Sequence, residues 1–462
     1  MHLTLGILRK SQAVSHALSF FWLDGFAVPA PAQVTQTVGR TSHNYRWYIE
    51  NTSTQQPGVK YDVADIFRKY IGEYKKTHRL SYEQSKAVSA IINCRTPAMG
   101  GVMKTCSVCK ALEFHYKACK NRHCPLCGAF EKAQWLEAQK KWVLPIHYFQ
   151  VVFTIDHVFN TLAAFNQKLI FDLFIKVAAQ LLKEFGQKYL GGEIGFSMVM
   201  HTWGQTMQEH LHLHFIVTGG ALISAPTGYS WNAASHKFLF PVKLLSNQFR
   251  NRFCFEISRL WVDGKLNTND GALDVQAMLT EGMSKNWEVY IQPPLYDKEK
   301  LIEYLGRYIF RIAISNHRIV AVGKDTVTFK YFDNRDDGKE KLMTLPVMEF
   351  IRRFLSHVLP DGFVRVRHFG LHHASCRAKL QHARRVLGLP FQLPATLKLK
   401  FLDWFKQITK SDEDPRICKF CGQGLMLPIR EFGPVFGWRL KAHALLGLLT
   451  SWKNVLPNFV LG

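Results

Sequence analysis

The strongest constraint on the fold is a cysteine-rich segment, CSVCKALEFHYKACKNRHCPLCG, which begins at Cys106. It contains two Cys-x-x-Cys pairs at the spacing of a zinc site, in which each pair turns two thiolates toward one ion. Cysteines that only pack in a core would not need this paired spacing. Four protein ligands leave no open coordination position, so we expect a structural role. The expected ligands are Cys106, Cys109, Cys124 and Cys127, with Cys119 and His123 as the alternative pair or as part of a second site.

A further Cys-x-x-Cys pair, Cys418 and Cys421, lies near the C-terminal end of the sequence. Two more ligands would be required to complete a second structural zinc site there. The nearest candidates along the chain are Cys376, His372, His373 and His382. Cysteine spacing of this kind is typical of metal sites in a reducing compartment rather than of disulfide frameworks. We therefore expect a protein of the cytoplasm.

The charge of the chain indicates a polyanionic partner. Over 462 residues the formal net charge is +24 and the isoelectric point is about 9.6. Such a surplus says little about the fold, but it favours nucleic acid as the partner, with a membrane surface as the second candidate. No apolar run reaches the ~18 residues that a membrane-spanning helix needs, so we expect no membrane partner.

The order of predicted elements indicates an α+β protein. A buried strand at 147–155, a helix at 159–186, a strand hairpin, a helix near 242–262 and further elements suggest an antiparallel sheet with helices on one face. We divide the chain into a poorly structured extension (1–60), a helical and zinc-binding domain (61–140), a catalytic domain (145–330) and a basic C-terminal region with a possible second zinc knuckle (331–462).

One predicted strand carries an unusual set of histidines. The segment EHLHLHFIVTGG places His210, His212 and His214 at alternate positions, so that they share one face of a strand. Neighbouring members of such a series lie ~7 Å apart, and two of them can bind one ion. We expect His212 and His214 to do so, because polar imidazoles have no reason to alternate with leucines in a purely structural strand.

A helix predicted near 297–313 carries a second unusual pattern, YLGRYIFR. Tyr304 and Tyr308 are four residues apart and share one face of a helix, and Arg307 and Arg311 form a basic stripe beside them. The tyrosine spacing alone indicates aromatic side chains that pack in a core. Together with the histidines, the tyrosines would supply a nucleophile that attacks phosphorus, while arginine neutralises the charge of the phosphate and a metal polarises it.

These motifs together resemble the HUH-type rolling-circle transposases of bacterial insertion sequences, the two-tyrosine class with an N-terminal zinc-binding domain. The segments that carry the resemblance are CRTPAMGG and NRHCPLC, then HTWGQ with HLHLHFIVTGG, YLGRYIFRIAISN, and FIRRFLSHVLPDGFVRVRHFG. The resemblance runs from about residue 62 to about residue 425. One departure is Leu211, which stands where the family commonly has proline between the first two histidines.

The resemblance implies a ferredoxin-like HUH nuclease domain and a set of roles. His212 and His214 would hold Mg²⁺ or Mn²⁺, and Tyr304 and Tyr308 would form 5′-phosphotyrosine links to single-stranded DNA at element ends and target. The third metal ligand stays open between His201 on the preceding strand and the weaker candidates His210, Glu209 and Asn316. Arg307, Arg311 and Arg122 are the expected DNA-binding residues. No phosphate-loop motif is visible, so we expect host replication proteins to unwind the DNA.

Three other functions compete with this interpretation. A zinc-dependent, sequence-specific DNA-binding regulator without catalysis fits the cysteines and the charge equally well, but it leaves the histidine and tyrosine pairs unexplained. A hydrolytic metallonuclease would activate water and leave no covalent adduct. An RNA-binding structural protein is the most distant alternative.

Overall fold

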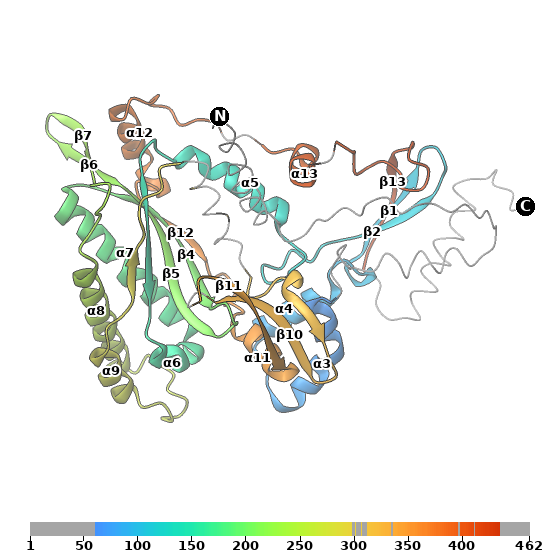
Figure 1. Ribbon diagram of the computed structural model, residues 1–462, viewed down its shortest axis with the longest axis horizontal. Coiled ribbons are helices and arrows are strands. Elements are labelled where there is room, and N and C mark those ends of the chain that lie inside the picture. Colours follow the sequence, from blue (N-terminus) through green and yellow to red (C-terminus); the bar gives the residue numbers. More distant parts are fainter. Residues whose placement is uncertain are drawn as a thin grey trace, which may run out of the picture.

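The computed structural model describes residues 61–297, 301, 306, 312–333, 336–395, 398–410 and 412–434 (Figure 1). The predicted N-terminal extension, 1–60, lies outside these residues. The same holds for Tyr304, Tyr308, Arg307 and Arg311.

The centre of the fold is a five-stranded antiparallel sheet in the order β12-β4-β5-β3-β8. Along the chain, β3, a helix, the β4–β5 hairpin, a second helix and β8 give the split βαββαβ arrangement of a ferredoxin-like fold, to which β12 adds an edge strand. The predicted α+β, ferredoxin-like class is therefore confirmed. The strands are β3 (Tyr148–Thr154), β4 (Gly195–Trp203), β5 (Glu209–Thr218), β8 (Val289–Ile291) and β12 (Val366–Gly370).

Helices cover one face of this sheet, as Figure 1 shows on its left side. Alternate residues of β5, namely Leu211, Leu213 and Phe215, are buried in the main core between the sheet and the helices. Aromatic rings pack between the sheet and the helices; for example, the ring centroids of Phe153 and Phe249 are 5.1 Å apart. The helices are α6 (Asn160–Phe165), α7 (Gln167–Leu190), α8 (Val242–Val262) and α9 (Val275–Ser284).

The opposite face of the sheet has a smaller apolar cluster. Val199 and Ile216 pack there with Leu301 and with Leu136 of helix α5 (Ala129–Gln139). Gly306 also lies against this helix, because a Cβ added to it would come within 2.9 Å of a Leu136 methyl carbon. Leu301 therefore packs on the histidine face of the sheet, since Ile216 follows His214 by two residues on one strand.

A second core joins the N-terminal helices to a later part of the chain. Ser81 and Gln84 form a capping box at the start of α4. Phe67 of α3 meets Phe354 of α11 edge to face. The elements of this helix–hairpin module are α3 (Val63–Thr77), α4 (Tyr82–Asn93), β9 (Ile319–Val322), β10 (Thr326–Asp333), β11 (Lys339–Pro346) and α11 (Val347–Ser356).

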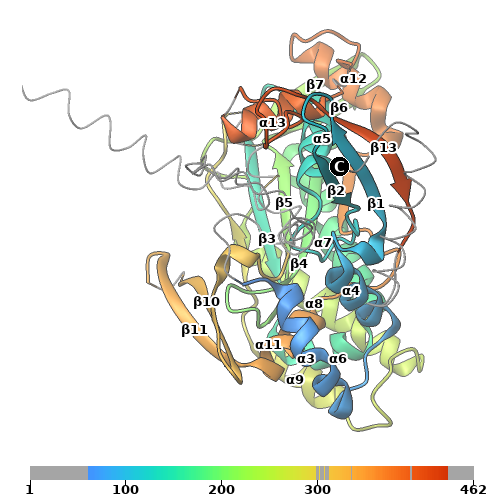
Figure 2. The ribbon, with the colours of Figure 1, turned by 90° about the vertical axis from the view of Figure 1, so that its right-hand side faces the viewer.

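A small cysteine-rich sheet forms a third module, in the order β13-β1-β2 (Figures 1 and 2). Its strands are β1 (Gly101–Cys106), β2 (Leu112–Tyr116) and β13 (Met426–Phe432). The remaining elements are β6 (Gly220–Ala225), β7 (Gly228–Ala233), α12 (Arg377–Val386), α13 (Phe401–Thr409) and short 3-10 turns at Pro97–Met99, Lys140–Trp142, His157–Phe159, Asn316–Arg318 and Ala374–Cys376.

Strand pairing and helix packing join segments that the sequence-based division assigned to different domains. β13 of the C-terminal region pairs with β1, and β12 pairs with β4 of the catalytic sheet. Helix α3 packs on α11, and the core that they share also contains Cys94 and Cys124. Each module is thus closed by a segment from a distant part of the chain.

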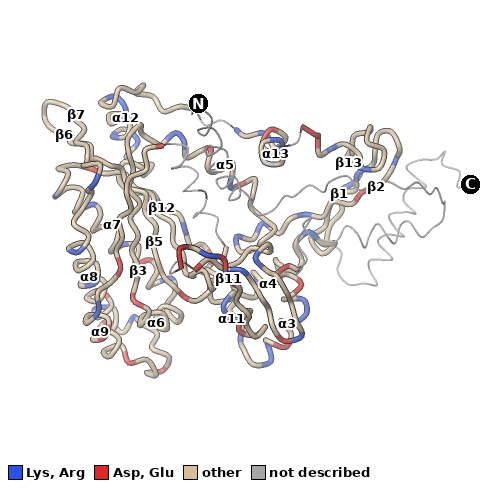
Figure 3. Tube along the Cα trace, viewed as in Figure 1, with Lys and Arg blue, Asp and Glu red and all other residues tan. Residues whose placement is uncertain are grey.

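Lys and Arg residues occur in every module along the trace, interspersed with Asp and Glu (Figure 3). The basic character is therefore not confined to the C-terminal region. Among the described residues, no helix combines the length and apolar composition needed to cross a bilayer.

The end of β12 gives a test of the edge-strand pairing. Gly370 has φ +53°, and a Cβ there would come within 1.9 Å of the Ile194 carbonyl oxygen; Gly362, with φ +71°, has nothing within 4 Å. Both Gly→Ala variants force alanine into a left-handed conformation, which costs about 1–2 kcal/mol. We expect Gly362→Ala to lose only this amount of unfolding free energy and Gly370→Ala to lose at least about 3 kcal/mol through the backbone clash. Equal losses in denaturant titrations would show that β12 can move off β4 at little cost.

Candidate functional site

Three histidines meet on the face of the sheet opposite the main helices. His201, His212 and His214 each place a ring nitrogen within 4.8 Å of one another. The ring centroids of His201 lie 5.3 Å from His212 and 5.0 Å from His214. His201 is buried, and the other two are partly exposed. Such a group offers three imidazole donors to one ion and leaves further coordination positions open to water or a phosphate.

The β4–β5 register brings these side chains together. His201 is the direct cross-strand partner of His212, and His214 lies opposite Val199 on the same face. Side chains of directly paired residues, and those one diagonal step away, are close enough to share one ion. The expected pair of His212 and His214 is thus joined by the candidate on the preceding strand.

Neighbouring groups orient two of the three rings. His212 Nδ1 lies 2.7 Å from the carbonyl oxygen of His210, so Nδ1–H donates there and Nε2 remains for a metal. The Gln150 amide lies 3.3 Å from His214 Nδ1, and its oxygen is buried without a hydrogen-bond partner among the described residues. A half-turn of that amide would let the oxygen accept Nδ1–H, which satisfies it and frees Nε2 of His214.

The other three candidates for the third ligand do not belong to this group. His210 is exposed and outside the group. The Glu209 carboxylate lies 3.8 Å from the Arg352 guanidinium. The side-chain oxygen of Asn316 accepts a hydrogen bond from the Val63 backbone N–H at the start of α3. The sequence had already offered His201 because it lies on the adjacent predicted strand.

The turn that joins β4 to β5 is held by the helix–hairpin module. Its three consecutive carbonyls, at 205–207, each accept one hydrogen bond: from Arg318 at 2.5 Å, from Arg353 at 3.0 Å and from His357 at 2.9 Å. Met207 is fully buried in the core of that module and has a positive φ of 57°. A non-glycine residue adopts this conformation only where its surroundings impose it. The hairpin that carries the histidines is thereby fixed at its tip.

His357 is neutral in this arrangement. Burial, together with the nearby Arg352 and Arg353, lowers the pKa of His357 to about 4, although its bond to the Met207 carbonyl acts in the opposite direction. A neutral imidazole has one N–H, and the carbonyl of Met207 must receive it from Nε2. Nδ1 therefore accepts from the Thr202 hydroxyl, which lies 3.2 Å away and adjoins His201 in sequence. Sequence reasoning missed this contact, and no local signal could have revealed it.

Two groups of four cysteines lie in the small module and beside it. The first contains Cys94, Cys119, Cys124 and Cys127. The sulfurs of Cys94 and Cys119 lie 3.4 Å and 3.7 Å from that of Cys127. Zinc–sulfur bonds of about 2.3 Å in a tetrahedron require sulfur–sulfur separations of about 3.8 Å, so the set fits zinc. Disulfide bonds would need separations of about 2.05 Å.

The second group contains Cys106, Cys109, Cys418 and Cys421. The expected single site made of the two pairs at 106–109 and 124–127 is therefore wrong. Cys106 lies at the end of β1, at the tip of the β1–β2 hairpin, whereas Cys94 precedes β1 and Cys119 follows β2 at its base. A six-residue strand spans roughly 20 Å, which keeps the two ends apart.

The expected partners of Cys418 and Cys421 were also wrong. Cys376 donates to a Glu193 carboxylate oxygen at 3.4 Å, and His372 lies 2.9 Å from the Ser197 hydroxyl on the central sheet. His373 contacts Ser375, and His382 stacks on Tyr229. These residues are close to Cys418 in sequence, but the chain between them crosses to the other module.

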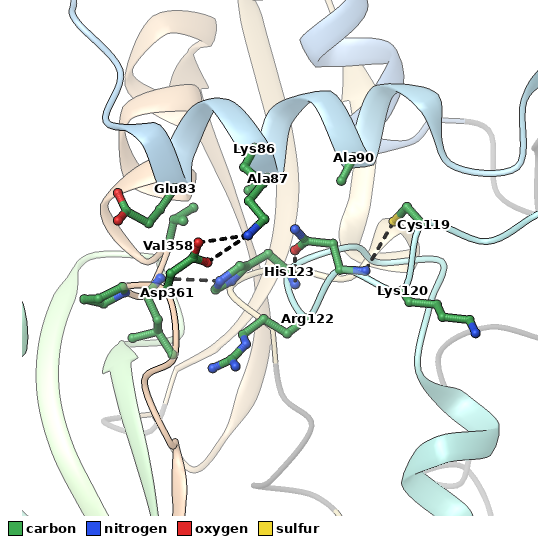
Figure 4. A pocket seen from close by; sticks show the side chains of 13 residues that line it. Glu83, Lys86, Ala87, Ala90, Cys119, Lys120, Arg122, His123, Val358 and Asp361 are labelled. Atoms are coloured by element: carbon green, nitrogen blue, oxygen red, sulfur yellow. Dashed lines mark hydrogen bonds and ion pairs between the residues drawn. The ribbon is translucent and has the colours of Figure 1, made fainter. Parts of the chain in front are cut away.

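His123 and Arg122 take part in the junction between modules. They line a cavity of about 300 Å³ that the Lys86–Asp361 ion pair closes on one side (Figure 4). His123 belongs to neither cysteine group, and its Nε2 accepts the Leu359 backbone N–H at 3.4 Å. Arg122 donates to the Phe363 carbonyl at 2.7 Å. Its expected role in DNA binding stays a prediction.

Comparisons with known proteins identify the family. A family model described as "Putative transposase" matches residues 195–379, and one described as "Transposase zinc-binding domain" matches residues 66–155. "Putative transposase y4qJ" of Sinorhizobium fredii (strain NBRC 101917 / NGR234) is 36% identical over 391 residues, which cover 81% of this chain and 96% of that protein. The chain belongs to this transposase family.

A second relative supports the same family. "Transposase for insertion sequence element IS801" of Pseudomonas savastanoi pv. phaseolicola is 25% identical to this transposase over 374 residues, which cover 78% of this chain and 87% of that protein. No solved structure matches. The resemblance inferred from the sequence is confirmed: the chain is a DNA-processing transposase with a structural zinc-binding domain.

The matched regions place the motifs of the transposase. The longer match begins with β4 and so includes all three histidines, and the zinc-binding match includes Cys94 and both pairs at 106–127. Cys94 was overlooked as a ligand, although it opens the segment CRTPAMGG, which already resembled the zinc domain of the family.

The neutral state of His357 makes the stability of the transposase pH-dependent. The pKa of His357 is about 4 in the folded state, below the ordinary 6.5. The part of the free energy of unfolding that depends on the neutral imidazole is therefore complete above pH 6.5 and is lost as the pH falls through 4. We expect His357→Gln, which can still donate to Met207 but cannot be protonated, to remove up to roughly 3 kcal/mol of this acid-induced loss. Denaturant titrations between pH 7 and pH 4 measure it.

The matched control is Thr202→Val. This variant removes the hydroxyl that donates to His357. It should lower the free energy of unfolding by about 1 kcal/mol at every pH, without changing how steeply that free energy falls with pH. Parallel pH profiles for the wild type and His357→Gln would contradict the neutral-histidine assignment.

Proposed function

We propose that this transposase nicks and rejoins single-stranded DNA at the ends of its element through 5′-phosphotyrosine intermediates, as in rolling-circle transposition. Tyr304 and Tyr308 are the nucleophiles, and His201, His212 and His214 hold the catalytic divalent ion. The observation that carries the proposal is the convergence of three imidazoles from two paired strands on one sheet face.

The donor set supports a divalent transition-metal ion. Three imidazoles suit Mn²⁺ better than Mg²⁺, which prefers oxygen ligands, so both ions are candidates and Mn²⁺ is favoured. When bound, the ion acts as a Lewis acid on the scissile phosphate. The hydrogen bonds of His212 and His214 keep the ligating nitrogens turned toward the group.

The proposed role of Tyr304 is supported by the described residues on either side of it in the sequence. Leu301 packs with Ile216, which shares the sheet face of His212 and His214, and Gly306 lies against Leu136 above that face. Tyr304 lies three residues after Leu301 and two residues before Gly306 in the sequence. This position in the sequence, between two described residues on that side of the sheet, supports the proposed role of Tyr304.

The chemical step is a transesterification. The Tyr304 or Tyr308 oxygen forms a bond to the phosphorus, and the bond from phosphorus to the 3′ oxygen breaks. The phenol proton passes to solvent, and the departing 3′ oxygen takes up a proton to become a free 3′-OH. The phosphotyrosine conserves the energy of the broken ester, so the 3′-OH of a second strand can reverse the step. Two tyrosines allow two such cuts.

The proposal extends to partners. Single-stranded DNA is the substrate that the family resemblance implies, and Arg307 and Arg311 would neutralise the scissile phosphate. Host replication proteins would unwind the duplex. Arg122 is proposed as a DNA contact at the junction of the modules, where its guanidinium is held by the Phe363 carbonyl.

A regulator without catalysis is disfavoured by the histidine group, which a DNA-binding role would not require. A hydrolytic metallonuclease would use the same ion but activate water. The two mechanisms differ in whether a covalent protein–DNA species forms.

The decisive experiment incubates the full chain with single-stranded element-end DNA and Mn²⁺ or Mg²⁺, then separates the products on a denaturing gel. We expect a protein–DNA adduct that survives boiling in detergent, and its complete loss in the double variant Tyr304→Phe with Tyr308→Phe. Cleavage without any adduct would support water as the nucleophile instead.

The histidine assignment has a matched control on the same strand. His201→Ala and His212→Ala should each reduce adduct formation by at least about 100-fold, because loss of one ligand weakens binding of the ion and displaces the phosphate. His210→Ala removes an exposed neighbour outside the group and should retain activity within a few fold. Equal loss in all three variants would overturn the assignment.

A further inference from the structure

We propose that Cys106, Cys109, Cys418 and Cys421 bind a second structural zinc ion, which fastens the C-terminal segment at 412–434 to the N-terminal zinc-binding domain. The four sulfurs lie in one group. Cys106 is 3.6 Å from Cys421, and Cys109 is 3.7 Å from Cys418, sulfur to sulfur. Both separations match the edge of a zinc tetrahedron, about 3.8 Å, and exceed a disulfide bond.

The two pairs have the same local backbone. In each Cys-x-x-Cys pair the residue after the second cysteine has a positive φ: 61° at Lys110 and 67° at Gly422. The same turn follows the pair of the first cysteine group, at Gly128, with φ 92°. Backbone N–H groups point at the sulfurs, from Cys109 to Cys106 and from Gly424 to Cys421, each at 3.4 Å. Such donors stabilise thiolates, which are the form that binds zinc.

The two pairs are fitted to each other. A Cβ on Gly424 would come within 2.3 Å of the Cys106 sulfur, so only glycine lets the second pair approach this closely. Ser107 donates its backbone N–H to the Leu425 carbonyl at 2.9 Å, and its hydroxyl oxygen accepts the Leu425 N–H at 3.0 Å. These bonds join the two pairs directly beside the sulfurs.

The site closes a long loop of the chain. Between Cys109 and Cys418 lie the central sheet, its helices and most of the helix–hairpin module. After leaving the sheet, the chain packs α13 on α5, with Trp404 buried and its ring 5.2 Å from Phe130, and then supplies β13 to β1. The small module is thus connected to the sheet through α5 and α13. Zinc would hold this return segment, which has few buried apolar residues of its own.

The experiment counts zinc in the purified full chain by elemental analysis and records the spectrum of the Co²⁺-substituted protein. We expect two zinc ions per chain in the wild type and one in Cys418→Ser with Cys421→Ser. Cys254→Ser, which changes a buried cysteine of α8 outside both groups, should keep two. Trypsin should cut the double variant first within 398–434, at sites such as Lys410 and Arg416, and leave the remainder intact.

Cys421→His separates the loss of zinc from a general failure to fold. Histidine is also a zinc ligand, so this variant should retain two ions and resist trypsin, while its Co²⁺ spectrum shifts as one thiolate is replaced by nitrogen. Two zinc ions in the double serine variant, or one in the wild type with Cys418 and Cys421 open to alkylation under native conditions, would overturn the proposal. Failure to form a DNA adduct would not affect these readouts, so the two proposals are tested independently.

Discussion

The register between β4 and β5 is the constraint on which the candidate site depends. It sets His201 opposite His212 and one diagonal step from His214, and it leaves Leu211, Leu213 and Phe215 facing the helices. A slip by one residue would exchange the two faces, exposing the leucines and burying the imidazoles. The large apolar core therefore fixes the geometry of the histidine group, because the same alternation that buries the leucines turns the histidines to the other side.

A second layer of structure holds this hairpin from outside the sheet. Arg318, Arg353 and His357 each bond to one carbonyl of the β4–β5 turn, and Met207 inserts into the core of the helix–hairpin module. Helix α3 packs on α11, which carries Arg353 and ends at its C-cap residue His357. Under the proposed mechanism, a rigid hairpin would favour catalysis, since small displacements of catalytic groups are costly.

Local patterns predicted much of the fold. An apolar run predicted the strand near 147–155, histidine–leucine alternation predicted the strand within 209–220, and the helix near 242–262 was placed at its observed bounds. The cysteine groups were predicted as zinc ligands but divided wrongly. Spacing reveals which cysteines form a pair, whereas the choice of partner pair depends on where a hairpin ends and on a strand, β13, that returns from more than 300 residues away.

The sequence by itself determined the residue types of the chemistry: alternating histidines, paired cysteines and two tyrosines at helical spacing, because each rests on contacts within a few residues. Tertiary structure alone decided which groups meet. It chose His201 over Glu209 and Asn316, joined Cys106 to Cys421 instead of Cys124, and gave His357 its buried position behind the hairpin. Contacts of this kind depend on strand register and chain crossings, which are set by the burial of the whole core and leave no local trace in the sequence.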